Sequence, residues 1–170
     1  EIGKNFSTAV PIVGDAKRVL PKLAAEVKEQ RRPEWIRWID QLREDHPSLH
    51  VRETRRMLPQ YVMRTLYEET QGNATIATGV GQHQMWAGQH YIYKRPRQLI
   101  SSGGLGTMGF ELPAAIGAQV ALPGQEVWAI AGDGGFQMTM QELAVLVDEQ
   151  LPVKIAIMNN GYLGMIRQWQ

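Results

Sequence analysis

Cysteine is absent from the 170 residues of this sequence, and its absence excludes several kinds of chemistry. Without thiols the chain forms no disulfide framework, binds no metal through thiolates and has no cysteine nucleophile. A charge excess of one sign is missing as well, because 18 basic and 17 acidic residues give a net charge of +1 at pH 7. The sequence therefore gives no reason to expect nucleic acid or a membrane surface as a partner.

Long apolar runs and a signal-peptide pattern are also missing, so we expect no membrane-spanning segment. The sequence lacks an initiator methionine too, since it begins at Glu1 and ends abruptly at Gln170. We interpret it as a piece of a longer protein. Its composition, with 44% hydrophobic and 21% charged residues, is that of a globular protein of about one domain.

Helical and strand-like patterns alternate along most of the sequence. Short β-branched and aliphatic runs bounded by turn residues predict strands at 74–80, 126–131 and 153–158, and residues 99–102 are expected to form a strand-like loop. Helical spacing predicts helices that begin at Leu58-Pro59, after His83, at Phe110 and after Gly135. Alternation of this kind predicts an α/β fold with a doubly wound parallel sheet, which we expect to be truncated at its C-terminus.

The first third of the chain carries weaker signals. Residues 10–14 form a short β-branched run that predicts a strand, and Asp15 is placed to cap a following helix. A second helix is expected from Pro33, because proline suits the first helical turn. Residues 28–56 interleave basic and acidic side chains, which indicates a solvated connecting segment.

Polar or glycine-rich turns follow the three predicted strands and the strand-like loop. They occupy residues 81–83, 103–108, 132–135 and 159–162. Parallel strands bring their carboxyl ends to one edge of a sheet, and open α/β sheets bind ligands at that edge. We therefore expect the functional site there.

Asp133 and Asn160 are the strongest candidates for metal ligands at this edge. Mg²⁺ takes about six oxygen ligands, commonly from carboxylates, amides, phosphates and water. Asp133 offers a carboxylate and Asn160 an amide oxygen, while Gly134 and Gly161 let the main chain approach a diphosphate closely. Each dipeptide alone is typical of a turn. Their pairing across one βαβ unit is what favours a magnesium–diphosphate site.

Residues 104–109 offer an alternative, because they match the G-x-G-x-x-G pattern of dinucleotide-binding domains. Asp133 would then bind the ribose. Two features weaken this interpretation: the acid lies further from the glycines than the usual ~20 residues, and glycines surround it. His83, Met108 and Trp169 also have simpler interpretations, the first as a strand-end histidine bonded to backbone and the others as packing residues.

Several longer stretches resemble the catalytic subunit of acetohydroxyacid synthase (acetolactate synthase), a thiamine diphosphate enzyme. Gly132-Asp133-Gly134 followed by Asn159-Asn160 is similar to the thiamine diphosphate motif, a GDG separated from NN by one βαβ unit. The closer resemblance rests on residues 80–86, 101–113, 132–143 and 159–170. Residues 1–5 and 10–15 resemble the end of that family's middle domain, so the resemblance spans nearly the whole chain.

The resemblance implies a role for each matching position. Asp133, Asn160 and the backbone carbonyl of Tyr162 would hold Mg²⁺ on the diphosphate. The residues that would contact the diphosphate or line its cleft are Gln82, His83, Gly134, Gly135, Gly161, Tyr162, Leu163, Gly164 and Met165. Those that would flank the aminopyrimidine are Gly106, Thr107 and Met108, of which Met108 would bend the cofactor. Trp169 would shape the second-substrate pocket, and Gly103, Gly104 and Asp15 would lie near FAD.

The same resemblance implies an enzyme that decarboxylates pyruvate and transfers the two-carbon unit to a second 2-ketoacid, in branched-chain amino-acid biosynthesis. Met108 and Trp169 would be its catalytic residues in this chain, with thiamine diphosphate and Mg²⁺ as cofactors and FAD in the complete enzyme. The resemblance also implies a homo-oligomer, either a dimer or a tetramer, with room for a regulatory subunit. It implies a cytoplasmic location, or a plastid location in a plant.

The resemblance assigns residues 1–57 to a remnant of the FAD-contacting middle domain with a helical linker, and 58–170 to an incomplete thiamine-diphosphate-binding domain. The family's pyrimidine-binding domain supplies a glutamate that is absent here, so we expect the fragment alone to be inactive. Glu111 stands where a small residue is expected and would alter the helix start. Two alternatives stay open: another thiamine diphosphate decarboxylase or synthase, and a non-catalytic fragment without cofactor.

Overall fold

The computed structural model describes residues 2–47 and 49–170, and its chain divides into two units at position 48. The first unit contains helix α1 (Ala16–Glu26) and helix α2 (Pro33–Asp45). Asp15 caps α1, as predicted, by accepting a hydrogen bond from the backbone amide of Lys17 at 2.7 Å. Neither helix buries any of its residues.

Residues 10–14 form no strand, so that prediction was wrong. Val10 and Val13 are 73% and 89% exposed. A strand needs a neighbour that pairs its N–H and C=O groups, and a β-branched composition does not supply one. Among the helices of the described residues, none has the length and hydropathy required to cross a membrane.

The second unit contains the alternating helices and strands that the sequence predicts. In chain order they are α3 (Pro59–Glu69), β1 (Thr75–Thr78), α4 (Gln82–His90), β2 (Leu99–Ser101), α5 (Glu111–Ala121), β3 (Val127–Gly132), α6 (Asp133–Thr139), the 3₁₀ turn η1 (Met140–Glu142), α7 (Leu143–Asp148), β4 (Lys154–Met158) and α8 (Gly164–Trp169). The three predicted strands form as β1, β3 and β4, and the expected strand-like loop at 99–102 contains the fourth strand, β2. The structure therefore confirms the α/β class.

The four strands make one parallel sheet with the order β2-β1-β3-β4. The chain moves outward in one direction from β1 to β2 and in the other from β3 to β4. The strand order therefore reverses between β1 and β3, as in doubly wound folds. Thr78 near the end of β1 pairs with Ile130, and Gly132 at the end of β3 pairs with Met158 of β4.

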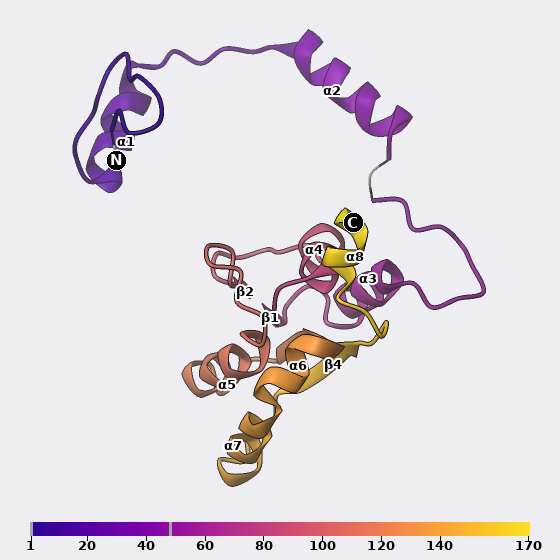
Figure 1. The fold of residues 1–170 in the computed structure, drawn as a ribbon. Coiled ribbons are helices and arrows are strands. Elements are labelled where there is room, and N and C mark those ends of the chain that lie inside the picture. The colour runs from indigo at the N-terminus through magenta and orange to yellow at the C-terminus, as the bar shows by residue number, and fades with distance from the viewer. Residues whose placement is uncertain (1, 48) are drawn as a thin grey trace. The chain divides into compact units, whose positions relative to one another are not determined.

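Alternate residues of the strands face two layers of helices, with α3 and α4 on one side of β1 and α5 on the other (Figure 1). On the first face Ile76 and Ile130 pack against Met63 of α3 and Ala87 of α4. The second face is built from small residues: Ala77, Ala129, Ala115 and Ala118, together with Val127. Small side chains on both partners let α5 lie close to the sheet.

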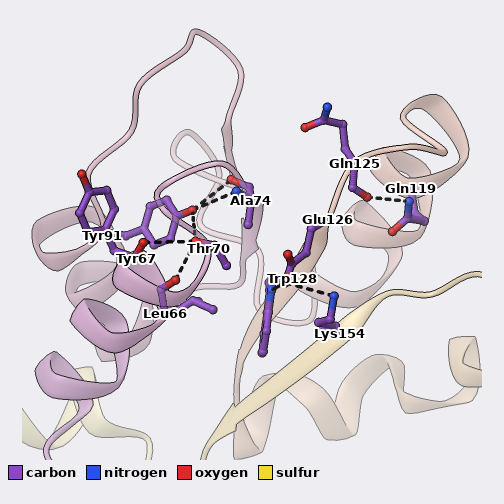
Figure 2. A network of polar contacts seen from close by, with 10 residues as sticks. All are labelled: Leu66, Tyr67, Thr70, Ala74, Tyr91, Gln119, Gln125, Glu126, Trp128 and Lys154. Carbon is purple, nitrogen blue, oxygen red and sulfur yellow. Dashed lines mark hydrogen bonds and ion pairs between the residues drawn. The ribbon is translucent and has the colours of Figure 1, made fainter.

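Polar contacts fix the amino ends of the strands (Figure 2). The Tyr91 hydroxyl accepts a hydrogen bond from the amide of Ala74 at 3.1 Å and lies 3.0 Å from the Thr70 hydroxyl. At the start of β3 the Glu126 carboxylate accepts a bond from the Trp128 indole at 2.8 Å and pairs with Lys154 of β4 at 3.1 Å. These contacts lie at the amino ends of the strands, so they do not occupy the edge of the sheet where the site is expected.

Candidate functional site

A cleft of about 190 Å³ lies at the carboxyl ends of β1, β3 and β4 and at the start of α8. Because the strand order reverses between β1 and β3, this is where doubly wound sheets bind ligands. The sequence-predicted residues that line it are Gln82, His83, Gly106, Met108, Asp133, Gly134, Gly135, Asn160, Tyr162, Leu163, Gly164 and Met165. The fold thus brings together residues from four separate turns.

Asp133 links the turn after β3 to the turn after β4. It is the first residue of α6, and one carboxylate oxygen accepts a hydrogen bond from the amide of Gly134 at 3.0 Å. The other accepts one from the amide of Gly161 at 2.9 Å. In the same turn the side-chain oxygen of Asn160 accepts a bond from the amide of Tyr162 at 3.0 Å. The two side chains among the three predicted metal ligands therefore belong to one hydrogen-bonded pair of loops, and each supplies an oxygen atom.

Gln82 ties the start of α4 to this pair of loops. Its side-chain oxygen accepts a bond from the Asn160 amide group at 3.3 Å, and its NH₂ group donates to Gln168 of α8 at 3.0 Å. A Cβ atom on Gly164 would overlap the Gln82 side-chain oxygen. Glycine at 164 therefore leaves the space that the Gln82 side chain occupies in this arrangement.

His83 is buried between the ends of β1 and β3. A Cβ atom on either Gly81 or Gly132 would lie 3.0 Å from its ring, so both glycines make room for the imidazole. Burial lowers the pKa of His83 to about 4, and the nearby Asp133 carboxylate opposes this shift. The ring is therefore neutral at pH 7. Its Nε2 atom is buried without a hydrogen-bond partner among the described residues, as expected of a group that contacts a ligand.

The backbone at Gly134 lies between two apolar side chains. A Cβ atom there would be 3.2 Å from Leu163 and 3.7 Å from the terminal methyl group of Met108. Met108 therefore lies over the turn that carries Asp133, although the two are far apart in the sequence. The cleft combines an apolar wall with a polar floor of oxygen atoms and main-chain amides.

Five predicted site residues do not line the cleft: Gly103, Gly104, Thr107, Gly161 and Trp169. Gly161 still contacts it through its bond to Asp133, whereas the Thr107 amide bonds to the Ser102 hydroxyl at 3.0 Å. Trp169 ends α8 with 81% of its surface exposed. Asp15 lies in the first unit, where its carboxylate caps α1.

Six further lining residues were not predicted: Val80, Gly81, Trp86, Gly132, Met158 and Ile166. Two of them follow a predicted residue by one helical turn, Trp86 after His83 and Ile166 after Leu163, so helical spacing was the signal that would have found them. Gly132 already belongs to the Gly-Asp-Gly motif. The side chains of Val80 and Met158 come from strand ends, where only the finished sheet shows which face meets the cleft.

The oxygen donors at the cleft suit a hard cation. Among the described residues, no group of three or more histidine, cysteine, aspartate or glutamate side chains is placed to hold a metal ion. Asp133 supplies one carboxylate, and Asn160 with the following backbone supplies neutral oxygens. Mg²⁺ bound to a diphosphate needs few protein ligands, because phosphates and water provide the rest.

Comparison with known proteins identifies the class to which this cleft belongs. Residues 79–170 match the family model for the thiamine pyrophosphate enzyme, C-terminal TPP binding domain. This match covers more than half of the chain, and it includes every residue that lines the cleft. The chain belongs to this family, and thiamine diphosphate is the ligand of its domain.

The curated relatives are acetolactate synthases. Over the whole of this chain it is 50% identical to the acetolactate synthase of Mycobacterium bovis. It is 47% identical to the acetolactate synthase large subunit of Corynebacterium glutamicum and 48% identical to acetolactate synthase 1, chloroplastic, of Oryza sativa subsp. japonica. The chain spans only 27–29% of the length of these proteins.

Proposed function

We propose that this chain is the diphosphate- and magnesium-binding part of an acetolactate synthase. The complete enzyme would decarboxylate pyruvate and transfer the two-carbon unit to a second 2-ketoacid, in branched-chain amino-acid biosynthesis. The observation that carries the proposal is the loop pair of Asp133 and Asn160, joined through Gly161 at the point where the strand order reverses. The similarity to acetolactate synthases over the whole chain supports the choice of enzyme.

Mg²⁺ would be held by the Asp133 carboxylate, the Asn160 side-chain oxygen and the backbone carbonyl of Tyr162. Both oxygens of Asp133 already face main-chain amides at the cleft, so a cation with its phosphates would exchange one set of polar contacts for another. When bound, thiamine diphosphate supplies the electron sink that decarboxylation of a 2-ketoacid requires. The protein supplies orientation and electrostatics.

Different residues of the cleft would contact different parts of the cofactor and substrate. His83 is neutral, so it would offer a ring nitrogen to the diphosphate without adding a fixed charge. Met108 and Leu163 offer an apolar wall on which an aromatic ring of the cofactor would rest, with Gly106 and Thr107 in the same turn. Trp169 would shape the second-substrate pocket from the end of α8.

The remaining features of the proposal concern the complete enzyme. Residues 1–57 would belong to a middle domain that contacts FAD, with Asp15, Gly103 and Gly104 near that cofactor, and residues 58–170 to the thiamine-diphosphate-binding domain. The complete enzyme would be a homo-oligomer with a regulatory subunit and would lie in the cytoplasm, or in a plastid in a plant, as the name of the rice relative says of that protein. The isolated chain would bind cofactor without turning over pyruvate.

Thermal unfolding with magnesium and thiamine diphosphate tests the proposal. A ligand that binds only the folded state stabilises it by about 2.7 kcal/mol at one hundred times its Kd, so the midpoint must rise with ligand concentration. We expect this rise in the wild-type chain, its loss with EDTA, and its loss in Asp133→Ala. Asp148→Ala, at the exposed end of α7, is the matched control and should keep the full rise.

Three results would contradict the proposal. No rise in the wild-type chain would support a non-catalytic fragment without cofactor. A full rise in Asp133→Ala would remove that residue from the metal site. A rise with NAD in place of thiamine diphosphate would favour the dinucleotide-binding interpretation of residues 104–109.

A further inference from the structure

Glu111 is a fully buried carboxyl group outside the lining of the cleft. It is the first residue of α5 and its exposed fraction is 0%. Neither side-chain oxygen makes a hydrogen bond of good geometry within residues 2–47 and 49–170, although the backbone amides of Glu111 and Gly109 lie near enough to act on the carboxyl. A buried polar group without a partner typically costs about 1–3 kcal/mol. A position occupied at such a cost calls for a structural or functional reason.

The Glu111 carboxyl lies between the end of β1 and the beginning of α6. One oxygen is close to the backbone of Gly135, where an added Cβ atom would lie 2.5 Å from it. The other is so close to Gly79 that an added Cβ atom would overlap it. Both glycines therefore leave space that the carboxyl fills. Gly135 is in the first turn of α6 and lines the cleft.

The turn that precedes Glu111 is also fastened to α6. The Thr139 hydroxyl donates to the carbonyl of Gly109 at 3.0 Å. An added Cβ atom on Gly109, whose φ is +79°, would lie 3.3 Å from the carbonyl oxygen of Gly135. Glu111 thus belongs to a contact between two backbone segments, one carrying Met108 and the other carrying Asp133.

Burial also shifts the balance between the charged and neutral forms of this carboxyl. It raises the pKa of Glu111, while the backbone amides of Glu111 and Gly109 act in the opposite direction. The neutral form of Glu111 therefore persists to a higher pH than that of a glutamate exposed to water. A glutamine would have nearly the same shape and no charge, whereas an alanine would leave the space empty.

We propose that Glu111 is a positioning residue for the cofactor cleft. Its side chain occupies the space left by Gly79 and Gly135 and so sets the separation between the turn that carries Met108 and the helix start that carries Asp133. The inference rests on the proposed function, because the ligand whose binding it controls is thiamine diphosphate with Mg²⁺. Glu111 does not line the cleft, so it acts through the two segments it separates.

Cofactor affinity tests the positioning role. The Kd for thiamine diphosphate in saturating Mg²⁺ is measured by calorimetry, well below the unfolding midpoint of each variant. We expect Glu111→Ala to weaken binding at least about tenfold, equivalent to ~1.4 kcal/mol, and Glu111→Gln to stay within about threefold of wild type. Gln119→Ala is the control for stability: this buried side chain lies in the same helix, away from the cleft, so its loss should lower the midpoint and leave the Kd unchanged.

The possible results separate the inference from the function it rests on. Binding by wild type and Glu111→Ala with the same Kd would overturn the positioning role and leave the proposed function standing. A tenfold loss in Glu111→Gln as well would mean that the acid itself, rather than its shape, is needed, and would also overturn it. No binding by the wild-type chain would overturn the proposed function.

A double-mutant cycle tests the packing without any ligand. Gly79→Ala should lower the unfolding midpoint strongly in the wild-type background, because the new Cβ atom meets the Glu111 carboxyl. In a Glu111→Gly background the same substitution should have a much smaller effect, since the three atoms nearest to the new Cβ atom all belong to the Glu111 carboxyl. Equal effects in the two backgrounds would show that the carboxyl does not occupy this space, and the inference would fail.

Discussion

His83 shows how burial alone can select a protonation state. The folded chain holds the ring at the junction of β1 and β3, where burial lowers its pKa from 6.5 to about 4. The unfolded chain exposes the ring to water and binds a proton below about pH 6.5. Between these two pH values the unfolded state binds more protons than the folded state, so stability falls as the pH falls.

This difference gives a pH prediction for the chain without ligand. As the pH falls from 7 to 4.5, His83 should account for a loss of up to about 3 kcal/mol in the free energy of unfolding. Urea unfolding followed by tryptophan fluorescence measures it in the wild type, in His83→Gln and in the control His50→Gln, whose side chain is exposed. The slope should be shallower in His83→Gln alone. Equal slopes in all three proteins would contradict a buried neutral ring.

At the scale of elements, a single side chain joins the loop before β2 to the turn before β1. Gln98 is 3% exposed, and its NH₂ group donates to the carbonyls of Gly72 and Ala74 at 2.7 and 2.8 Å. Its oxygen accepts bonds from the amides of Lys94 and Arg95 at 2.8 and 3.3 Å. One glutamine thus satisfies four backbone groups where no regular structure does so.

Truncation of this side chain should be costly. Gln98→Ala removes all four bonds and takes the side-chain donor away from the carbonyls of the buried Gly72 and Ala74, of which Ala74 keeps a longer bond from the Tyr91 hydroxyl, so we expect a loss of about 2 kcal/mol in unfolding free energy. Gln125→Ala is the control, because that half-buried side chain accepts a single bond from Arg95 at 3.2 Å. Denaturant unfolding of both variants gives the comparison. A loss in Gln98→Ala no larger than that in the control would show that water replaces the glutamine at little cost.

At the scale of the whole molecule, the chain divides at position 48 into two units, and only the second contains the residues that line the cleft. All residues that line the cleft lie between 80 and 166, in the second unit. In the first unit, α1 and α2 bury none of their residues, so neither contributes a core of its own. Cofactor binding should therefore depend on the second unit.

A chain of residues 49–170 tests this expectation. It retains the sheet, both helix layers and the cleft, so its unfolding midpoint in thiamine diphosphate and Mg²⁺ should rise as far as that of residues 1–170. Differential scanning fluorimetry across a range of cofactor concentrations makes the comparison, with Asp133→Ala in the shorter chain as the control. Loss of the rise in the shorter wild-type chain would assign part of the site to residues 1–48.

Local features of the sequence were sufficient for most of the elements and for the pairing of Asp133 with Asn160. Helix starts at Asp15 and Pro33 depend on capping and on a fixed φ, which act within one turn of chain. The four strands depend on short apolar runs between turns. Asp133 and Asn160 follow two of those strands, so their meeting at one edge needed only the assumption that the sheet is parallel. Each of these predictions uses residues that are near one another in sequence or related by one βαβ unit.

Contacts between distant residues decided the rest. Residues 10–14 have a strand-like composition, yet they have no neighbouring strand, and a strand exists only through pairing. The order β2-β1-β3-β4 places His83 beside Gly132, which no spacing in the sequence indicates. Glu111 is read from the sequence as an unexpected charge at a helix start. The tertiary structure alone shows that two distant glycines, Gly79 and Gly135, leave the space it occupies, because packing joins segments that the chain keeps apart.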